Sequence, residues 1–109
     1  MVHNELEQKV TCILNNPELV AIKTVIEKNH SIDCLLLLYM DKGRWKDAKK
    51  FVTENNLILS DATFRSRMCE FEKLGLAKSK RIDPLKKFYS KTELCEKLIK
   101  QLIELFEQL

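Results

Sequence analysis

The chain has 109 residues, of which 45% are hydrophobic and 32% are charged, and its formal net charge is +3. This length allows one domain with one hydrophobic core, and the composition is that of a folded globular protein, not a disordered one. With only two Gly and two Pro residues, the chain has little turn material for an all-β fold. Its many Leu, Ile, Lys and Glu residues favour helices.

The sequence contains no run of about 18 uncharged apolar residues, so we expect no membrane-spanning helix and no membrane partner. The longest apolar run, Cys34–Met40, has the length of a buried helix. The N-terminus lacks a basic region followed by an apolar stretch, so we expect no secretory signal. Together these features predict a cytoplasmic protein.

Four cysteines occur, at positions 12, 34, 69 and 95, and none forms a CxxC pair. Neither His3 nor His30 stands at a metal-ligand spacing from them, so we favour reduced thiols over a metal site or a disulfide. Two glycines leave no Gly-rich phosphate loop, and no nucleophile–base set is recognisable by spacing. We therefore expect no cofactor and no enzymatic activity.

The first half of the chain reads as a series of helices. Asn4 is expected to cap a first helix, Pro17 to open a second that runs to about residue 28, and Ser31 to cap a third over residues 32–42, with Gly43 as its stop. A fourth helix is expected over residues 45–55, followed by a turn over 55–59. The outer face of this fourth helix carries Lys46, Lys49 and Lys50.

Ser60 is a good cap for a helix over residues 61–74, in which Phe64, Met68 and Phe71 form an apolar stripe. The opposite face of this helix is small and polar near its N-terminal end, which allows a close approach to another molecule. Gly75 ends the helix. Residues 76–82 and 87–89 then read as two short strands, joined by a basic turn over residues 83–86.

The last helix is expected to begin at a capping box formed by Ser90 and Glu93. Its apolar residues repeat at spacings of three and four, which is the pattern of a heptad seam. We expect this seam, widened by Phe106, to form a dimer interface; the interface residues are Cys95, Leu98, Leu102, Leu105, Phe106 and Leu109. The alternative is that the helix packs on the N-terminal helices of the same chain, against Leu6, Val10, Ile13, Ile22 and Val25.

Positive charge is concentrated in the middle of the chain. Residues 44–91 contain thirteen Lys or Arg against six Asp or Glu, a charge of +7, and the remainder contains six against ten, a charge of −4. A basic region between acidic ends is typical of a protein that binds a polyanion; the alternative is a solvated charged surface with no such partner.

The segment Ser60–Leu76 resembles the recognition-helix stretch of prokaryotic winged helix-turn-helix regulators, with Thr63, Phe64, Ser66, Arg67, Met68, Phe71, Gly75 and Leu76 at matching places. Tyr89–Glu93 is similar to the stretch that follows the wing, with Lys91 in place of the usual Leu. The resemblance covers residues 32–108 and implies a mainly helical fold with a small β-hairpin wing, extra N-terminal helices and a long C-terminal helix. The spacing between Ala48 and Ser60 is longer than the family's usual turn.

The resemblance also implies a function: a homodimeric regulator of transcription that binds double-stranded DNA and is nucleoid-associated when bound. Residues expected to read bases in the major groove are Ala62, Thr63, Arg65 and Ser66. Residues expected to contact the DNA backbone lie on the fourth helix, at Arg67 and in a wing over residues 77–88, and are Lys46, Lys49, Lys50, Arg67, Lys78, Lys80, Arg81, Lys86 and Lys87. For Arg67, an intramolecular ion pair is the alternative.

We expect a single domain over residues 1–109, made of an N-terminal helical extension (1–29), a winged-helix core (31–90) and a dimerisation helix (91–109). Two other functions are compatible with this layout: a winged-helix module that binds another protein, and an adaptor that organises or partitions DNA. The sequence does not specify an operator or an effector ligand.

Overall fold

The computed structural model describes residues 2–83 and 86–109, with the side chains of residues 4–81 and 87–109. In this part of the chain the fold is mainly helical with one small antiparallel hairpin, as expected. The elements are α1 (Val2–Leu14), α2 (Pro17–Ile26), α3 (Ser31–Tyr39), α4 (Trp45–Glu54), α5 (Asp61–Lys73), β1 (Ala77–Asp83), β2 (Lys86–Lys91) and α6 (Glu93–Glu107). None of the helices in the described ranges combines the length and apolar character that crossing a bilayer requires.

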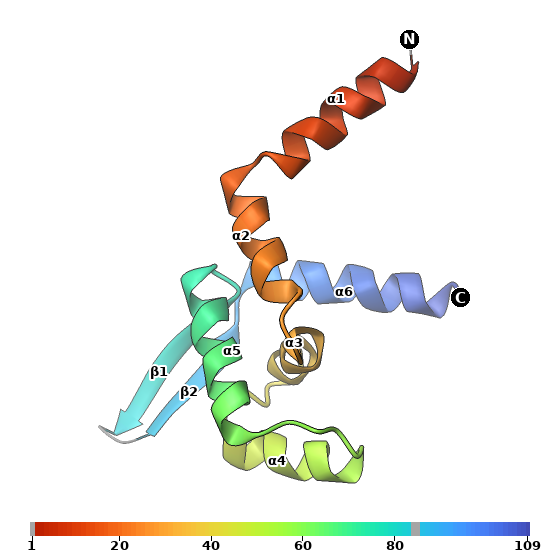
Figure 1. The fold of residues 1–109 in the computed structure, drawn as a ribbon. Coiled ribbons are helices and arrows are strands. Elements are labelled where there is room, and N and C mark those ends of the chain that lie inside the picture. The colour runs from red at the N-terminus through yellow and green to blue at the C-terminus, as the bar shows by residue number, and fades with distance from the viewer. Residues whose placement is uncertain (1, 84–85) are drawn as a thin grey trace.

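The hydrophobic core lies between α3, α4, α5, the base of the hairpin and the first half of α6. Its fully buried members include Leu35, Leu38, Phe64, Met68 and Phe71. The predicted stripe of α5 is therefore confirmed as core, and the apolar run of α3 places that helix at the centre of the molecule (Figure 1). The two ring centroids of Trp45 and Phe64 lie 5.5 Å apart, which joins α4 to α5.

The boundaries of α5 follow the local signals in the sequence. The Ser60 hydroxyl accepts a hydrogen bond from the Thr63 amide at 3.1 Å and so caps the helix. At the other end Gly75 takes a left-handed backbone conformation with φ of 78°, which ends the helix at little steric cost. Both ends of the helix that carries the predicted base-reading residues are thus defined by local interactions, the Ser60 cap and the left-handed Gly75.

Three predicted caps are wrong. Asn4 lies inside α1, which already begins at Val2. Ser31 is buried and its hydroxyl donates to the carbonyl of Val25, so it closes the α2–α3 connection and does not cap α3. Ser90 lies in β2, and Thr92 caps α6 by accepting from the Cys95 amide. In each case a serine or asparagine was assigned to a cap from local sequence, but the neighbouring element extends over it or gives it another partner.

Gly43 does not end α3, which stops at Tyr39 and is closed by Asp41 in a left-handed conformation. Gly43 instead meets the hairpin: its carbonyl accepts a hydrogen bond from the Tyr89 amide at 3.0 Å. A Cβ at this position would overlap the Tyr89 backbone carbonyl. Glycine therefore allows β2 to lie directly against the α3–α4 connection, and this contact sets the position of the hairpin.

Strands β1 and β2 pair Ala77 with Lys91 and Ser79 with Tyr89, and the register becomes irregular between Arg81 and Asp83. The turn predicted over residues 83–86 falls partly outside the described residues. At the base of the hairpin, the Lys91 ammonium donates to the carbonyl of Tyr39 at 2.9 Å and lies over its ring. This contact at the C-terminal end of α3 accounts for a lysine at this position.

Two segments, which we call the terminal arms, project from this body: α1 and residues 102–109 at the end of the chain, of which only Ile103 is half-buried against the core (Figure 1). The apolar face of α1 is exposed at Leu6, Val10 and Ile13. Packing of α6 on α1 of the same chain, part of the alternative drawn from the sequence, is therefore not what the structure has, whereas Val25, which that alternative also named, lies in the core with Cys95 and Ile99 of α6. Exposed apolar residues of α6 include Leu102, Leu105, Phe106 and Leu109.

Candidate nucleic-acid interface

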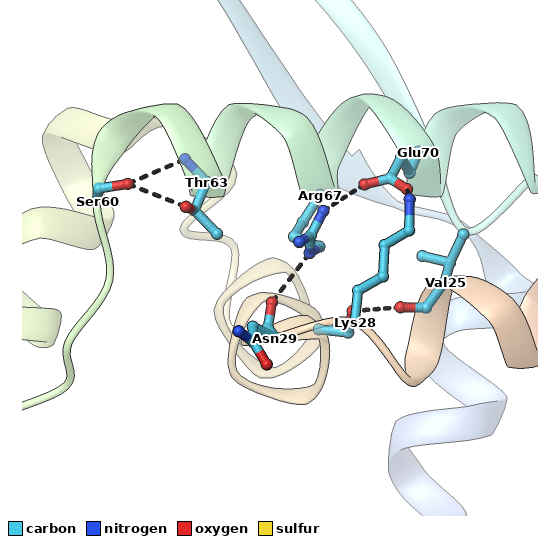
Figure 2. Close-up of polar contacts among 8 residues, drawn as sticks. Val25, Lys28, Asn29, Ser60, Thr63, Arg67 and Glu70 are labelled. Carbon is cyan, nitrogen blue, oxygen red and sulfur yellow. Dashed lines mark hydrogen bonds and ion pairs between the residues drawn. The ribbon is translucent and has the colours of Figure 1, made fainter.

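The outward face of α5 carries mainly small side chains near its N-terminal end. Ala62, Arg65 and Ser66 are exposed, and Cys69 is half-buried one turn further along. Thr63 is also half-buried, because its hydroxyl accepts a hydrogen bond from Ser60 at 3.0 Å as part of the cap (Figure 2). Three of the four predicted base-reading residues therefore lie on one exposed surface, and the fourth stabilises the start of the helix.

A groove of about 560 Å³ lies beside this face, between α4, α5 and β2. Trp45, Phe64 and Tyr89 contribute aromatic rings to its walls. Every charged residue that lines it is basic: Arg44, Lys46, Lys49, Arg65 and Lys87. These cations come from three elements, so the fold concentrates positive charge where the end of α5 meets the hairpin. We call this feature the basic groove.

Three of these cations have acidic neighbours. Nε of Arg65 lies 2.6 Å from an Asp61 carboxylate oxygen, Nε of Arg44 lies 3.4 Å from Asp47, and Nζ of Lys87 lies 3.3 Å from Glu72. The Arg65 pair joins exposed side chains one helical turn apart, so it is of the kind that contributes less than about 1 kcal/mol. Asp61 therefore orients Arg65 on the exposed face.

The pair between Glu72 and Lys87 holds the hairpin against α5. The Ser79 hydroxyl donates to the Glu72 carboxylate, and this bond, together with the Lys87 ammonium, lowers the pKa of Glu72. Glu72 in turn raises the pKa of Lys87. Lys87 also lies 5.2 Å from the centre of the Tyr89 ring. Its ammonium group is thus positioned at the basic groove by contacts on two sides.

Arg67 forms the intramolecular ion pair that was one of its two predicted roles. Its side chain is only 15% exposed; Nη1 lies 2.5 Å from Glu70, and Nε donates to the Asn29 carbonyl at 3.0 Å (Figure 2). Lys28 pairs with the other oxygen of Glu70. Although partial burial raises the pKa of Glu70, the hydrogen bonds and charges of Lys28 and Arg67 outweigh it and hold that pKa below its usual value. Arg67 therefore anchors α5 to the α2–α3 connection.

The remaining cations assigned to the DNA backbone do not form one surface. Lys50 follows Lys49 on α4 but pairs with Glu54 and does not line the groove. In the hairpin, successive side chains of a strand point to opposite faces, so Lys78 and Lys80 lie on one face and Ser79 and Arg81 lie on the other.

Ser79 and Lys87 mark the hairpin face that contacts α5. Arg81 stands opposite Lys87 in the strand register and therefore shares this face, whereas Lys78 and Lys80 are exposed on the other face. Lys86 begins β2, and its side chain lies outside the described residues. The hairpin cations assigned to the DNA backbone therefore lie on two different faces of the hairpin.

The residues assigned to dimerisation are also divided. Cys95 is fully buried in the core of its own chain, where burial raises the pKa of its thiol to about 11, so it is not available to a partner. Leu98 is half-buried, and Leu102, Leu105, Phe106 and Leu109 are exposed. Only the second half of the heptad seam is free for an interface.

The sequence analysis missed the contact between Gly43 and Tyr89 that forms the groove. Next to Gly43 stands Arg44, the N-terminal cap residue of α4. Period-two alternation in the strands was a signal that could have separated Lys80 from Arg81 in advance. No protein-family model, curated protein or solved structure matches the chain, so the function is inferred from the site alone.

Proposed function

We propose that the chain is a double-stranded DNA-binding protein with a winged helix-turn-helix fold, acting as a homodimeric regulator of transcription. In this proposal α4 and α5 are the helix-turn-helix pair, α5 enters the major groove, and the β1–β2 hairpin is the wing. The connection between α4 and α5, residues 55–60, is the extended turn noted in the sequence.

The observation that supports this proposal most directly is the basic groove. It places five cations beside the small, exposed face of α5, at the helix end that a helix-turn-helix protein directs to base edges. Lys46, Lys49 and Lys87 are positioned to contact phosphates on the flanks of the inserted helix, which supplies affinity without sequence information. The absence of bulk at Ala62 and Ser66 allows the helix backbone to approach the bases.

Arg65 is the residue best placed to read a base. Its pair with Asp61 uses Nε, whereas a bidentate contact to guanine uses the two terminal nitrogens of the guanidinium group. Asp61 can therefore hold the side chain extended while those nitrogens face the DNA. Such a contact contributes about 1–3 kcal/mol of discrimination between bases.

The first test is fluorescence anisotropy with a random duplex at low salt, repeated over a range of salt concentrations. We expect the logarithm of the binding constant to fall linearly with the logarithm of the salt concentration. Absence of binding at tens of micromolar protein would contradict the proposal. Selection of bound sequences from a random duplex library then gives the site, which a two-fold symmetric dimer predicts to be palindromic.

The neighbouring lysines of α4 supply a matched pair of variants. Lys49→Ala removes a groove cation and should reduce the salt slope by about one unit, whereas Lys50→Ala removes the same charge outside the groove and should leave the slope nearly unchanged. Arg65→Ala should relax base preference at one position of each half-site. Equal effects of Lys49→Ala and Lys50→Ala would mean that only net charge matters.

A second candidate function is a module that binds another protein, and the exposed apolar residues of the terminal arms favour it. A module of this kind would bind its partner equally well after Arg65→Ala and Lys49→Ala. It would also show no salt-dependent binding to random duplex. The anisotropy experiment therefore separates the two candidates.

A further inference from the structure

The protomer exposes more surface than a compact chain of its mass. Its solvent-accessible area is 8225 Å², whereas a folded monomer of 12.8 kDa is expected to expose about 6,300 Å². Its radius of gyration is 16.1 Å, against about 13 Å for a compact domain of this length. The excess of about 1,900 Å² is of the size that one subunit buries in an obligate dimer. An excess of this size matches the area that the association of two copies of this chain would bury on each of them.

The exposed end of α6 is too short, and its apolar stripe is too wide, for a two-stranded coiled coil with the α6 of another copy. Because Cys95 and Ile99 are buried in their own chain, the free seam extends only over residues 102–109, about one heptad, whereas stable coiled coils sustain three or four. Phe106 lies beside the seam and widens the apolar stripe. A stripe of this width is typical of a helix that packs into a groove between two others.

Such a groove exists at the junction of α1 and α2. It has a volume of about 550 Å³ and is lined mainly by apolar side chains, with Lys23, Thr24 and Glu27 at its polar part. Its apolar lining consists of Ile13, Leu14, Leu19, Val20, Ile22 and Ile26. Ile13, Leu14, Leu19 and Val20 are all more than two-fifths exposed. A free apolar helix and a free apolar groove are thus present on the same protomer, on arms that diverge from the body (Figure 1).

We propose that two copies exchange these arms: residues 102–109 of α6 from each copy pack into the α1–α2 groove of the other, with Phe106 entering the groove. The proposal rests on the homodimer of the proposed function but not on DNA binding. A two-fold axis makes both contacts equivalent, so the arrangement closes as a dimer and does not propagate.

Analytical ultracentrifugation of the full chain and of two single variants tests the exchange. Ile13→Glu changes the groove and Phe106→Glu changes the arm that enters it; both residues are exposed in the protomer, so folding should be retained. We expect a dimer for the parent and at least a tenfold weaker dimer for each variant, because each substitution damages both equivalent contacts. Gln8→Glu, on the face of α1 opposite Ile13, and Gln101→Glu, which precedes the packing segment of α6, are charge-matched controls at exposed positions and should remain dimeric.

Mixing the two variants gives the decisive measurement. A heterodimer of Ile13→Glu with Phe106→Glu retains one undamaged contact, between the parental groove of one chain and the parental α6 of the other. The mixture should therefore dimerise more tightly than either variant alone. A monomeric parent, a dimeric Ile13→Glu variant, or a mixture with no gain would each overturn the exchange; the second outcome would indicate pairing of α6 with α6.

The DNA measurements distinguish this inference from the proposed function. If the parent dimerises by exchange but does not bind duplex DNA, the exchange stands and the DNA-binding proposal fails. If the parent binds DNA and the exchange fails, the reverse holds. When both are correct, Phe106→Glu should bind a single half-site with the salt slope of one protomer and should lose the added affinity of a palindrome.

Discussion

The body of the molecule and its terminal arms carry similar apolar residues, but only the body buries them. Phe64 on α5 is 1% exposed and Phe106 on α6 is 73% exposed, although both stand on an apolar helical stripe. The difference is that α5 meets α3, α4 and the hairpin, whereas the end of α6 extends away from these elements (Figure 1). Amphipathic periodicity therefore identifies a face that needs a partner, and it does not say whether the partner belongs to the same chain.

The largest expected difference between body and arms is in thiol reactivity. Cys12 on α1 is exposed, whereas Cys34 in α3 is fully buried, and burial, assisted by Asp33, raises the pKa of its thiol to about 12. Because the thiolate is the reacting species and buried groups react only after opening, Cys12 should be alkylated by iodoacetamide at least about 1,000 times faster than Cys34. Peptide mass spectrometry measures both rates in one sample. Similar rates would mean that the body opens as readily as the arm.

The two phenylalanines provide the corresponding stability test. Phe64→Ala should lower the free energy of unfolding by about 3–5 kcal/mol, because it leaves a cavity next to Trp45. Phe106→Ala should change it by no more than about 0.5 kcal/mol at protein concentrations where the chain is monomeric. Urea denaturation followed by circular dichroism measures both. A large effect of Phe106→Ala in the monomer would contradict the exposure of the arm.

The two glycines test how the hairpin is held on the body. Gly43→Ala should cost up to about 3 kcal/mol, because the new Cβ overlaps the Tyr89 carbonyl and separates β2 from the α3–α4 connection. Gly75→Ala meets open space and should cost about 1 kcal/mol from its left-handed backbone alone. The same denaturation measurement ranks them. If Gly43→Ala were the milder change, the close approach of β2 would not be a constraint on the fold.

A smaller effect than those of Phe64→Ala and Gly43→Ala is expected at the contact that joins α5 to the N-terminal helices. Glu70→Gln should cost about 1.5 kcal/mol at pH 7, since it weakens the charged hydrogen bonds with Arg67 and Lys28. The control Glu54→Gln, in an exposed pair with Lys50, should have nearly no effect.

The contribution of Glu70 should also depend on pH. Because its pKa in the folded protein lies below the ordinary value of 4.5, the contribution is complete above pH 4.5 and is lost as pH falls through the folded-state pKa. The stability difference between parent and Glu70→Gln should therefore shrink on acidification. A difference that grows toward low pH would show that the ionised carboxylate is not the stabilising form.

The order of the elements was predictable because it depends on local physics. Helical periodicity located α5 and its buried stripe, Ser60 and Gly75 marked its ends, and Pro17 opened α2. Two predictions failed where the partner of a residue lies in another element: Ser31 bonds to Val25 of α2, and Gly43 meets Tyr89 of β2. Local patterns contain no information on which of two plausible partners a side chain or backbone group will find.

The candidate site divides in the same way. The basic middle region and the small face of α5 were evident from the sequence, since both depend only on residue type and helical spacing. Which cations gather was decided by the tertiary structure: the contact of β2 with Gly43 brings Lys87 to Lys49 and Arg65, while strand alternation places Lys80 on the other face. Charge acts through distances in space, and these distances are set by the packing of the elements.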